Sequence, residues 1–363
     1  MKRFLISQLL LLPVVSQLAL AIQAPTGVIS LAGDQSVVLH WDRSTDASLL
    51  GYRVYRSING VGGPFSLLST SLLTGPGYCD LNNKVINGQT NYYYATAVDT
   101  GLQESLPSAT VGALPHPFAS DDEFLDYVQQ TCFDYFWYGA NPANGLVPDR
   151  SATNSTCSIA AVGFGLTAIS IAADHGWITR TQAVARVLAT LKTFLQGPQG
   201  PGTTGIIGYK GWFYHFLDMN TALRSGSELS SIDTALLLGG ILYAKQYFNG
   251  PSADETSIRT MADAIFNRVD WAFMAQGTDA VAMGWQPTSP RFRSGTSRSR
   301  RAGARLQRRY VRVLRGGNDG GAPVLRTIHQ ASRTPRYARI GAAGYGGPAA
   351  RPLLHRRALQ HLV

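Results

Sequence analysis

Two apolar stretches, 158-SIAAVGFGLTAISIAA-173 and 231-SIDTALLLGGILYA-244, decide the fold class of this chain of 363 residues. Both are apolar on nearly every side of a helix, which is typical of helices that neighbours bury all round. The stretches at 180–195 (RTQAVARVLATLKTFL) and 257–273 (SIRTMADAIFNRVDWAF) are amphipathic, so they would cover the buried helices. Buried and covering helices that alternate along the chain predict a toroid of helical hairpins.

The all-α part is predicted to occupy residues 120–287. Its expected helices lie at about 120–138, 158–174, 179–196, 231–248 and 256–275, joined by loops rich in glycine and proline. A linker, 114-LPHPFASDD-122, precedes this part and offers Ser120 as the N-cap of the first helix. The chain is therefore predicted to be multidomain, with a boundary in this linker.

Residues 24–115 are rich in β-branched and aromatic residues and carry turn signals about every ten residues, which predicts a small all-β sandwich. The expected strands include SVVLHW, GYRVYRS and NYYYATAVD, and the turn Asn87-Gly88 precedes the last of them. Over its whole length this stretch resembles a fibronectin type III domain. Its aromatic residues fit core packing better than sugar binding, and such a fold by itself implies no activity.

The first 21 residues have the pattern of a secretory signal peptide. Lys2 and Arg3 precede an apolar run, and Ala19-Leu20-Ala21 is a cleavage site of the small-x-small type. The apolar run is shorter than the about 20 residues that cross a bilayer. We therefore expect a periplasmic or secreted protein with no integral membrane segment after cleavage; a retained N-terminal anchor is the alternative.

Three cysteines are expected in that oxidising compartment: Cys79, Cys132 and Cys157. Cys132 and Cys157 bracket one loop and could form a disulfide, but two separately buried thiols fit the spacing equally well. The sequence shows no metal-ligand spacing, so neither a metal nor another cofactor is expected.

The net charge of +10 conceals a strongly uneven distribution. Residues 291–363 hold 17 of the 32 basic residues, all arginine, and one of the 22 acidic residues. The preceding 290 residues therefore carry a net charge of −6, so the body of the protein is mildly acidic and is not expected to bind nucleic acid.

Acidic residues gather where the two buried helices are predicted to begin. Asp149 and Arg150 lie in the loop before the first, and Glu228 and Asp233 flank Ser231, the expected N-cap of the second. The N-termini of buried helices in an α-toroid converge on one mouth, and glycoside hydrolysis needs two carboxyl groups there. Glu228 is the expected acid; helix capping by Glu228 and a local Asp149–Arg150 ion pair are the alternatives.

Between these loops, 211-GWFYHFLD-218 concentrates aromatic side chains. We expect Trp212 and Tyr214 to stack on sugar rings and His215 to hydrogen-bond sugar hydroxyls. Packing in the core is the alternative for such a run.

Seven segments together resemble the bacterial glucoamylase-like family, which includes endo-β-1,2-glucanases and a domain of cyclic β-1,2-glucan synthases. They are FDYFW (133–137), GLVPDRS (145–151), residues 158–183, GWFYHFLD (211–218), SELSSIDTALLLGG (227–240), RVDWAFM (268–274) and MGWQP (283–287). The resemblance implies an (α/α)6 toroid that hydrolyses a β-linked glucan, best matched by an inverting endo-β-1,2-glucanase, with a glucan polysaccharide or oligosaccharide as substrate. It supports Glu228 as catalytic more strongly than Asp149 and Asp233. A non-catalytic envelope glycan-binding protein, and another α-toroid enzyme such as a polysaccharide lyase, are the alternatives.

The resemblance ends at Pro287. Residues 288–363 are rich in arginine, glycine, alanine and proline, which GC-rich codons yield, and we interpret them as the disordered product of a shifted reading frame. A basic extension that binds polyanions, or a basic amphipathic helix over 300–314, is the alternative. Residues 120–287 supply about five of the twelve helices of a six-hairpin toroid, so the toroid is expected to be incomplete and its catalytic activity is in doubt.

Overall fold

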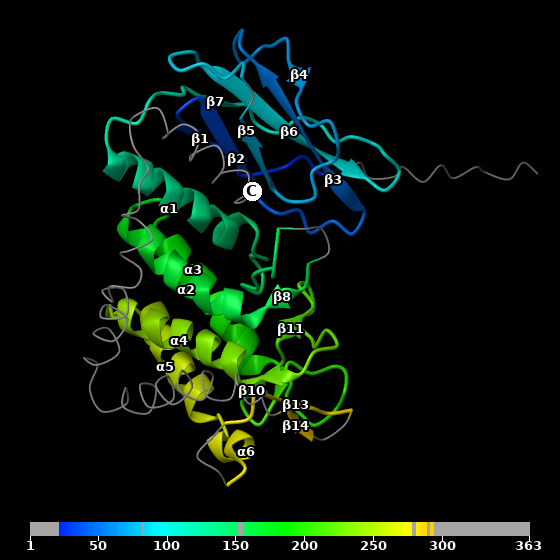
Figure 1. The fold of residues 1–363 in the computed structure, drawn as a ribbon, viewed down its shortest axis with the longest axis vertical. Coiled ribbons are helices and arrows are strands. Elements are labelled where there is room, and N and C mark those ends of the chain that lie inside the picture. The colour runs from blue at the N-terminus through cyan, green and yellow to red at the C-terminus, as the bar shows by residue number, and fades with distance from the viewer. Residues whose placement is uncertain (1–21, 82, 152–154, 278–280, 289–290, 294–363) are drawn as a thin grey trace, which may run out of the picture.

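The computed structural model describes residues 22–81, 83–151, 155–277, 281–288 and 291–293. The predicted signal peptide and the arginine-rich segment beyond residue 293 lie outside these ranges. Figure 1 shows a strand-rich part at one end of the molecule, helix α1 (Asp121–Tyr138) against it, and the remaining helices stacked beyond α1. The chain is thus a multidomain β/α protein, as its sequence predicted.

Two antiparallel sheets form the strand-rich part, called the sandwich below. The first sheet has the order β1-β2-β5, and the second has the order β4-β3-β6-β7. Their strands are β1 (Ile29–Gly33), β2 (Ser36–His40), β3 (Leu49–Ser57), β4 (Ser66–Leu67), β5 (Gly77–Asp80), β6 (Asn91–Asp99) and β7 (Val111–Ala113). The three strands expected from the sequence correspond to β2, β3 and β6.

Aromatic rings fill the space between the two sheets. Trp41, Tyr52 and Tyr93 are each at most 1% exposed, and the Trp41 and Tyr52 rings meet edge to face with their centroids 5.2 Å apart. The Tyr93 hydroxyl donates a hydrogen bond to the buried Asp80 carboxylate at 3.1 Å. These aromatic residues are therefore core residues of the sandwich, as their alternating pattern predicted.

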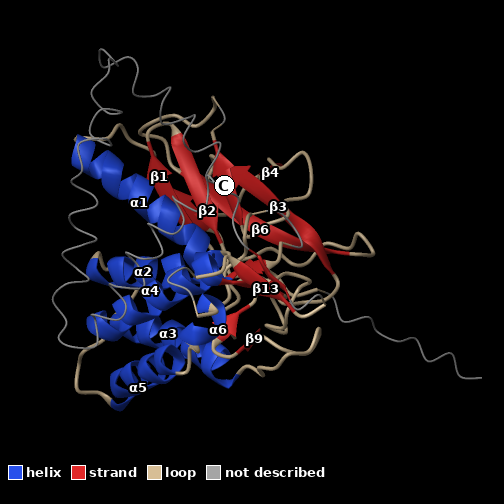
Figure 2. Cartoon of the chain, turned by 60° about the horizontal axis from the view of Figure 1, so that its bottom comes forward, coloured by secondary structure: helices blue, strands red, loops and turns tan. Residues whose placement is uncertain are grey.

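Six helices are found among the described residues, and Figure 2 shows most of them as one stack beneath the sandwich. They are α1, α2 (Ile159–Asp174), α3 (Arg180–Gln196), α4 (Ser231–Tyr247), α5 (Ala253–Asn267) and α6 (Trp271–Ala275). The prediction of a single helix at about 256–275 is wrong, because the helix is interrupted between α5 and α6. The Asp270 carboxylate caps the backbone N–H of Phe273 at 2.9 Å, which starts a new short helix.

The described residues contain no disulfide and no helix that could span a membrane. All three cysteines are free thiols, so Cys132 and Cys157 do not form the disulfide that their spacing allowed. Burial raises the pKa of the Cys157 thiol. Among the described helices, none combines the length and the apolar character needed to cross a bilayer.

Helices α2 and α4 are the buried pair, and their backbones touch. A Cβ atom added to Gly240 would lie 2.7 Å from the Cα of Gly163, and one added to Gly163 would lie 2.9 Å from the Cα of Leu237. No side chain fits at either position without separating the helices. Helices α3 and α5, which are amphipathic, pack on each other and cover this pair on one side.

We therefore expect Gly240→Ala to lower the free energy of unfolding by about 1–3 kcal/mol, because the added methyl group overpacks a backbone contact. Gly239→Ala is the matched control, since a Cβ there meets no atom within 4 Å and alanine favours the helix. Chemical denaturation followed by circular dichroism measures both. Equal stability of the two variants would contradict the close contact.

Candidate functional site

A short ladder of strands joins the N-termini of α2 and α4. The two-residue strand β8 (Cys157–Ser158) leads into α2, and β12 (Leu229–Ser230) leads into α4. β11 (Phe216–Leu217) pairs with β8, while Tyr214 bridges to Leu229 in β12. On its other side β12 pairs with β13 (Gly284–Gln286), which pairs with β14 (Arg291–Arg293). The segments that carry the predicted site residues therefore meet at one end of the helical pair.

His215 lies between two of the predicted carboxylates. Its Nδ1 is 3.6 Å from Glu228 Oε1, and its Nε2 is 3.6 Å from Asp233 Oδ1. Its ring stacks on Phe216, with the centroids 3.9 Å apart, and its backbone N–H donates to the Glu228 carbonyl at 2.9 Å. The side chains of His215 and Glu228 are each 27% exposed and that of Asp233 is 13% exposed. The cluster is partly dry, yet open to a ligand.

Asp233 also takes part in capping α4. The N-cap is Ser230, not the expected Ser231, because Ser231 is already helical and the extended Ser230 supplies the capping hydroxyl. The Ser230 hydroxyl donates to Asp233 Oδ2, and the Asp233 backbone N–H donates back to Ser230 Oγ at 3.3 Å. One carboxylate oxygen of Asp233 is thus held by the cap, and the other faces His215.

Asp149 and Arg150 form a local ion pair, the alternative that the sequence left open. Asp149 Oδ2 accepts hydrogen bonds from Arg150 Nε at 3.2 Å and from its terminal nitrogen at 3.0 Å. The Arg150 side chain is 72% exposed. Their loop is fixed, because the Tyr135 hydroxyl donates to the Pro148 carbonyl at 2.6 Å and the Asp149 N–H donates to Thr156.

Trp212 and Tyr214 do not lie where stacking on a sugar would require them. Trp212 is 1% exposed and Tyr214 is 0% exposed. The Trp212 indole donates to the Asp270 carbonyl at 2.8 Å, and the Arg224 guanidinium lies 4.7 Å from the centre of the Tyr214 ring. Both rings belong to the hydrophobic core of the helical part, so core packing is the interpretation that fits them.

Arg224 is a functional neighbour that the sequence analysis missed. Its Nε donates to the Ser227 carbonyl at 2.7 Å, one residue before Glu228, and a terminal nitrogen donates to Gln286 of β13 at 3.2 Å. Arg224 therefore ties the Glu228 loop to the strand ladder. The only signal in the sequence is an arginine four residues before the candidate acid, which is too common a spacing to interpret.

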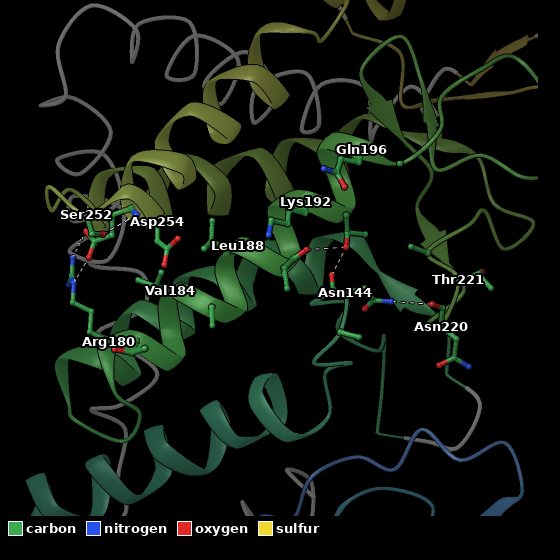
Figure 3. Close-up of a pocket in the computed structure, with 18 residues that line it drawn as sticks. Asn144, Arg180, Val184, Leu188, Lys192, Gln196, Asn220, Thr221, Ser252 and Asp254 are labelled. Carbon is green, nitrogen blue, oxygen red and sulfur yellow. Dashed lines mark hydrogen bonds and ion pairs between the residues drawn. The ribbon is translucent and has the colours of Figure 1, made fainter.

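A wide groove lies elsewhere. Figure 3 shows it along α3 and the start of α5, with a cavity volume of about 1010 Å³. Arg180 and Glu255 form an ion pair at one end of it, with N–O distances of 2.8 and 3.0 Å. The described residues that line it include no aromatic side chain and no member of the Glu228 cluster. The chemistry of a hydrolase is therefore better placed at the helix N-termini than in this groove.

The helical pair, with acidic side chains at its N-terminal end, fits the resemblance to the glucoamylase-like family, and comparison with known proteins supports that resemblance. The chain is 30% identical over 274 residues to the exo beta-1,2-glucooligosaccharide sophorohydrolase (non-reducing end) of Parabacteroides distasonis. This match covers 73% of the chain and 36% of that relative. No family model matches the chain.

One solved structure supports the same resemblance. The beta-1,2-glucanase from Parabacteroides distasonis superposes with a TM-score of 0.61 at 28% identity, over 74% of this chain and 38% of that one. A Fn3-like protein from Clostridium thermocellum, 28% identical, matches 28% of this chain and 98% of its own, with a TM-score of 0.23. The resemblance to the glucoamylase-like family and its β-1,2-glucanases is confirmed, and the chain spans little more than a third of the length of the two Parabacteroides relatives.

Proposed function

We propose that this chain carries part of the active site of a glycoside hydrolase that cleaves β-1,2-linked glucan, with Glu228 as the general acid. The observation that carries the proposal is the meeting of Glu228, His215 and Asp233 at the N-terminal end of a buried helix. The match to a Parabacteroides distasonis sophorohydrolase named for β-1,2-glucooligosaccharides, and to a solved beta-1,2-glucanase of the same organism, supports the substrate class.

In this mechanism Glu228 protonates the oxygen of the scissile bond while a second carboxylate activates water on the opposite face of the sugar. Inversion requires the two carboxyl groups to lie about 6.5–9.5 Å apart, so the second must come from another segment. Asp149 is the candidate for that role, because its loop leads into the neighbouring helix α2. Asp233 and His215, both next to Glu228, would position the acid and hydrogen-bond the substrate.

The sandwich is proposed to be a fibronectin type III domain at residues 24–115, followed by a glucoamylase-like domain at 120–287. A three-stranded and a four-stranded antiparallel sheet, with aromatic residues between them, support the first assignment. The second is proposed to be an incomplete (α/α)6 toroid, because its described helices form only part of a ring.

A non-catalytic glycan-binding protein remains the second candidate, favoured by one observation. One oxygen of Asp233 is held by the cap of α4 and Asp149 is paired with Arg150, so neither carboxylate is left free to activate water. The partner would still be a glucan, held at the same mouth. We also propose export to the periplasm or the cell exterior, from the signal-like residues 1–21.

Release of reducing ends from β-1,2-glucan is expected to exceed release from β-1,3- and α-1,4-glucans. Glu228→Gln is expected to lower it by about 10²- to 10⁴-fold, because an amide cannot supply the acid proton. Glu123→Gln, at the far end of α1 from the Pro148 loop, is the control and should keep full activity. Binding of β-1,2-glucan without release from any glucan would instead establish the glycan-binding alternative.

Expression of the full gene in a bacterium with a periplasm is expected to yield a chain that begins near Ile22. N-terminal sequencing of the periplasmic fraction measures this, because a signal peptidase cuts after a small-x-small motif such as Ala19-Leu20-Ala21. A chain that keeps Met1 and stays with the membrane would show a retained anchor instead.

The arginine-rich segment gives a test at the level of the gene. If it arises from a shifted reading frame, translating the other two frames beyond the codon for Pro287 should restore tryptophan- and glutamate-bearing segments similar to the relatives. Resequencing the gene at this point checks the shift. Open frames without such segments would contradict the hypothesis and favour a basic extension.

A further inference from the structure

A buried histidine and a buried aspartate face each other where the sandwich meets α1. His40 ends strand β2, and Asp134 lies on the face of α1 that covers this strand. His40 Nε2 is 3.4 Å from Asp134 Oδ2, and the two side chains are 10% and 2% exposed. Both atoms are sealed from solvent, and neither has a well-aligned hydrogen-bond partner among the described residues. Buried polar groups that face each other are stable only when one donates a proton that the other accepts.

The contact of His40 with the sandwich fixes which ring nitrogen faces the aspartate. The ring is hydrogen-bonded to the Pro76 carbonyl, which can only accept, so that nitrogen carries a proton. Nδ1 lies on the side of Gly77, next to Pro76, since a Cβ on Gly77 would be 2.9 Å from it. Nε2 is thus left as the nitrogen that either accepts a proton from Asp134 or shares one with it.

We propose that His40 and Asp134 hold one proton between them and that this makes the attachment of the sandwich to α1 sensitive to pH. With one proton the pair has no net charge, whether it is written as neutral imidazole with carboxylic acid or as imidazolium with carboxylate. A second proton, or the loss of the only one, leaves an uncompensated charge in an almost dry interface.

The pKa values of His40 and Asp134 define the pH range in which the pair holds one proton. Burial raises the pKa of Asp134 to about 8 and lowers the pKa of His40 to about 4. The folded pair therefore keeps one proton from about pH 4 to about pH 8. In the unfolded chain the ordinary pKa values are 3.8 for the aspartate and 6.5 for the histidine.

Burial raises the pKa values of three neighbouring groups, two tyrosines and one cysteine, further above this range. The Tyr138 ring stacks on His40 with the centroids 5.2 Å apart, and burial raises the pKa of Tyr138 and of Tyr127 on the same helix. Burial also raises the pKa of Cys79, on β5, to about 12. The other ionisable groups around the pair are Asp42 and Arg43 after β2, Tyr78 on β5, Tyr135 on α1, Arg150 in the loop after α1 and Arg186 on α3.

Comparing the bound protons gives the direction of the effect. From about pH 4 to 6.5 the folded and unfolded forms of the pair each hold one proton, so the pair contributes no pH dependence. Above pH 6.5 the unfolded chain releases its histidine proton while the folded pair keeps one. The folding equilibrium constant should therefore fall by up to tenfold per pH unit, or about 30-fold by pH 8.

Variants of the two residues should give different pH profiles, measured as the unfolding equilibrium constant from urea titrations of the full chain between pH 4 and 8.5. In Asp134→Asn the folded histidine stays neutral, so stability should rise from pH 4 to 6.5 and then level off. In His40→Gln the folded aspartate keeps its proton alone, so stability should fall continuously from pH 4 to 8. The wild type should be level first and fall only above pH 6.5.

Asp126→Asn is the matched control, because Asp126 lies on the same helix and contacts His175 at 2.9 Å in an exposed pair. It should keep the wild-type profile. Nitrogen-15 NMR of the histidines provides a second readout on the wild type, in which the Nδ1 proton of His40 should persist throughout and the Nε2 signal should change only near pH 8. If Asp134→Asn retains the fall above pH 6.5, or if the His40 ring titrates near pH 6.5, the shared proton is wrong.

Discussion

The direct contact between the backbones of α2 and α4 is the constraint on which the rest of the helical part depends. Glycine at positions 163 and 240 lets the two helices approach until main-chain atoms meet. Two helices held this close place β8 and β12, the segments before them, where residues 214–217 pair with both. That pairing is the short strand ladder, and it brings Glu228 and Asp233 to either side of His215. The candidate site follows from the helix contact.

Helix α1 packs against the sandwich on one side and against the other helices on the other side. Residues 127, 131 and 134 recur at helical spacing and are almost fully buried against the sandwich, while Phe133 belongs to the helical core. On β2 the alternation is equally clear, since Val37 and Leu39 enter the sandwich core and Val38 faces Tyr127. The sandwich therefore packs on the outer face of α1 and covers it. The Pro148 carbonyl, bound by Tyr135 of the same helix, extends this support to the Asp149 loop.

The sequence predicted those features that periodicity encodes. The positions of the main helices and of strands β2, β3 and β6 could be predicted, because hydrophobic period and chain order determine them. It could not separate an aromatic residue that stacks on sugar from one that packs in a core, since both uses require the same ring, and Trp212 and Tyr214 proved to be buried. The His40–Asp134 contact joins residues 94 positions apart, and no local pattern marks it.

The positions of the carboxylates suggest why close-packed glycines would serve hydrolysis. Glu228 is attached to the start of α4, whereas Asp149 belongs to the loop before α2, so their separation depends on how closely the two helices approach. Inverting hydrolysis requires a gap that admits one water molecule and no more, and displacements of about 1 Å already cost activity. A helix contact made by side chains can repack, but a contact between main-chain atoms has no such freedom. The glycines at the contact would thus set the width of the catalytic gap, if Asp149 and Glu228 act as its two sides.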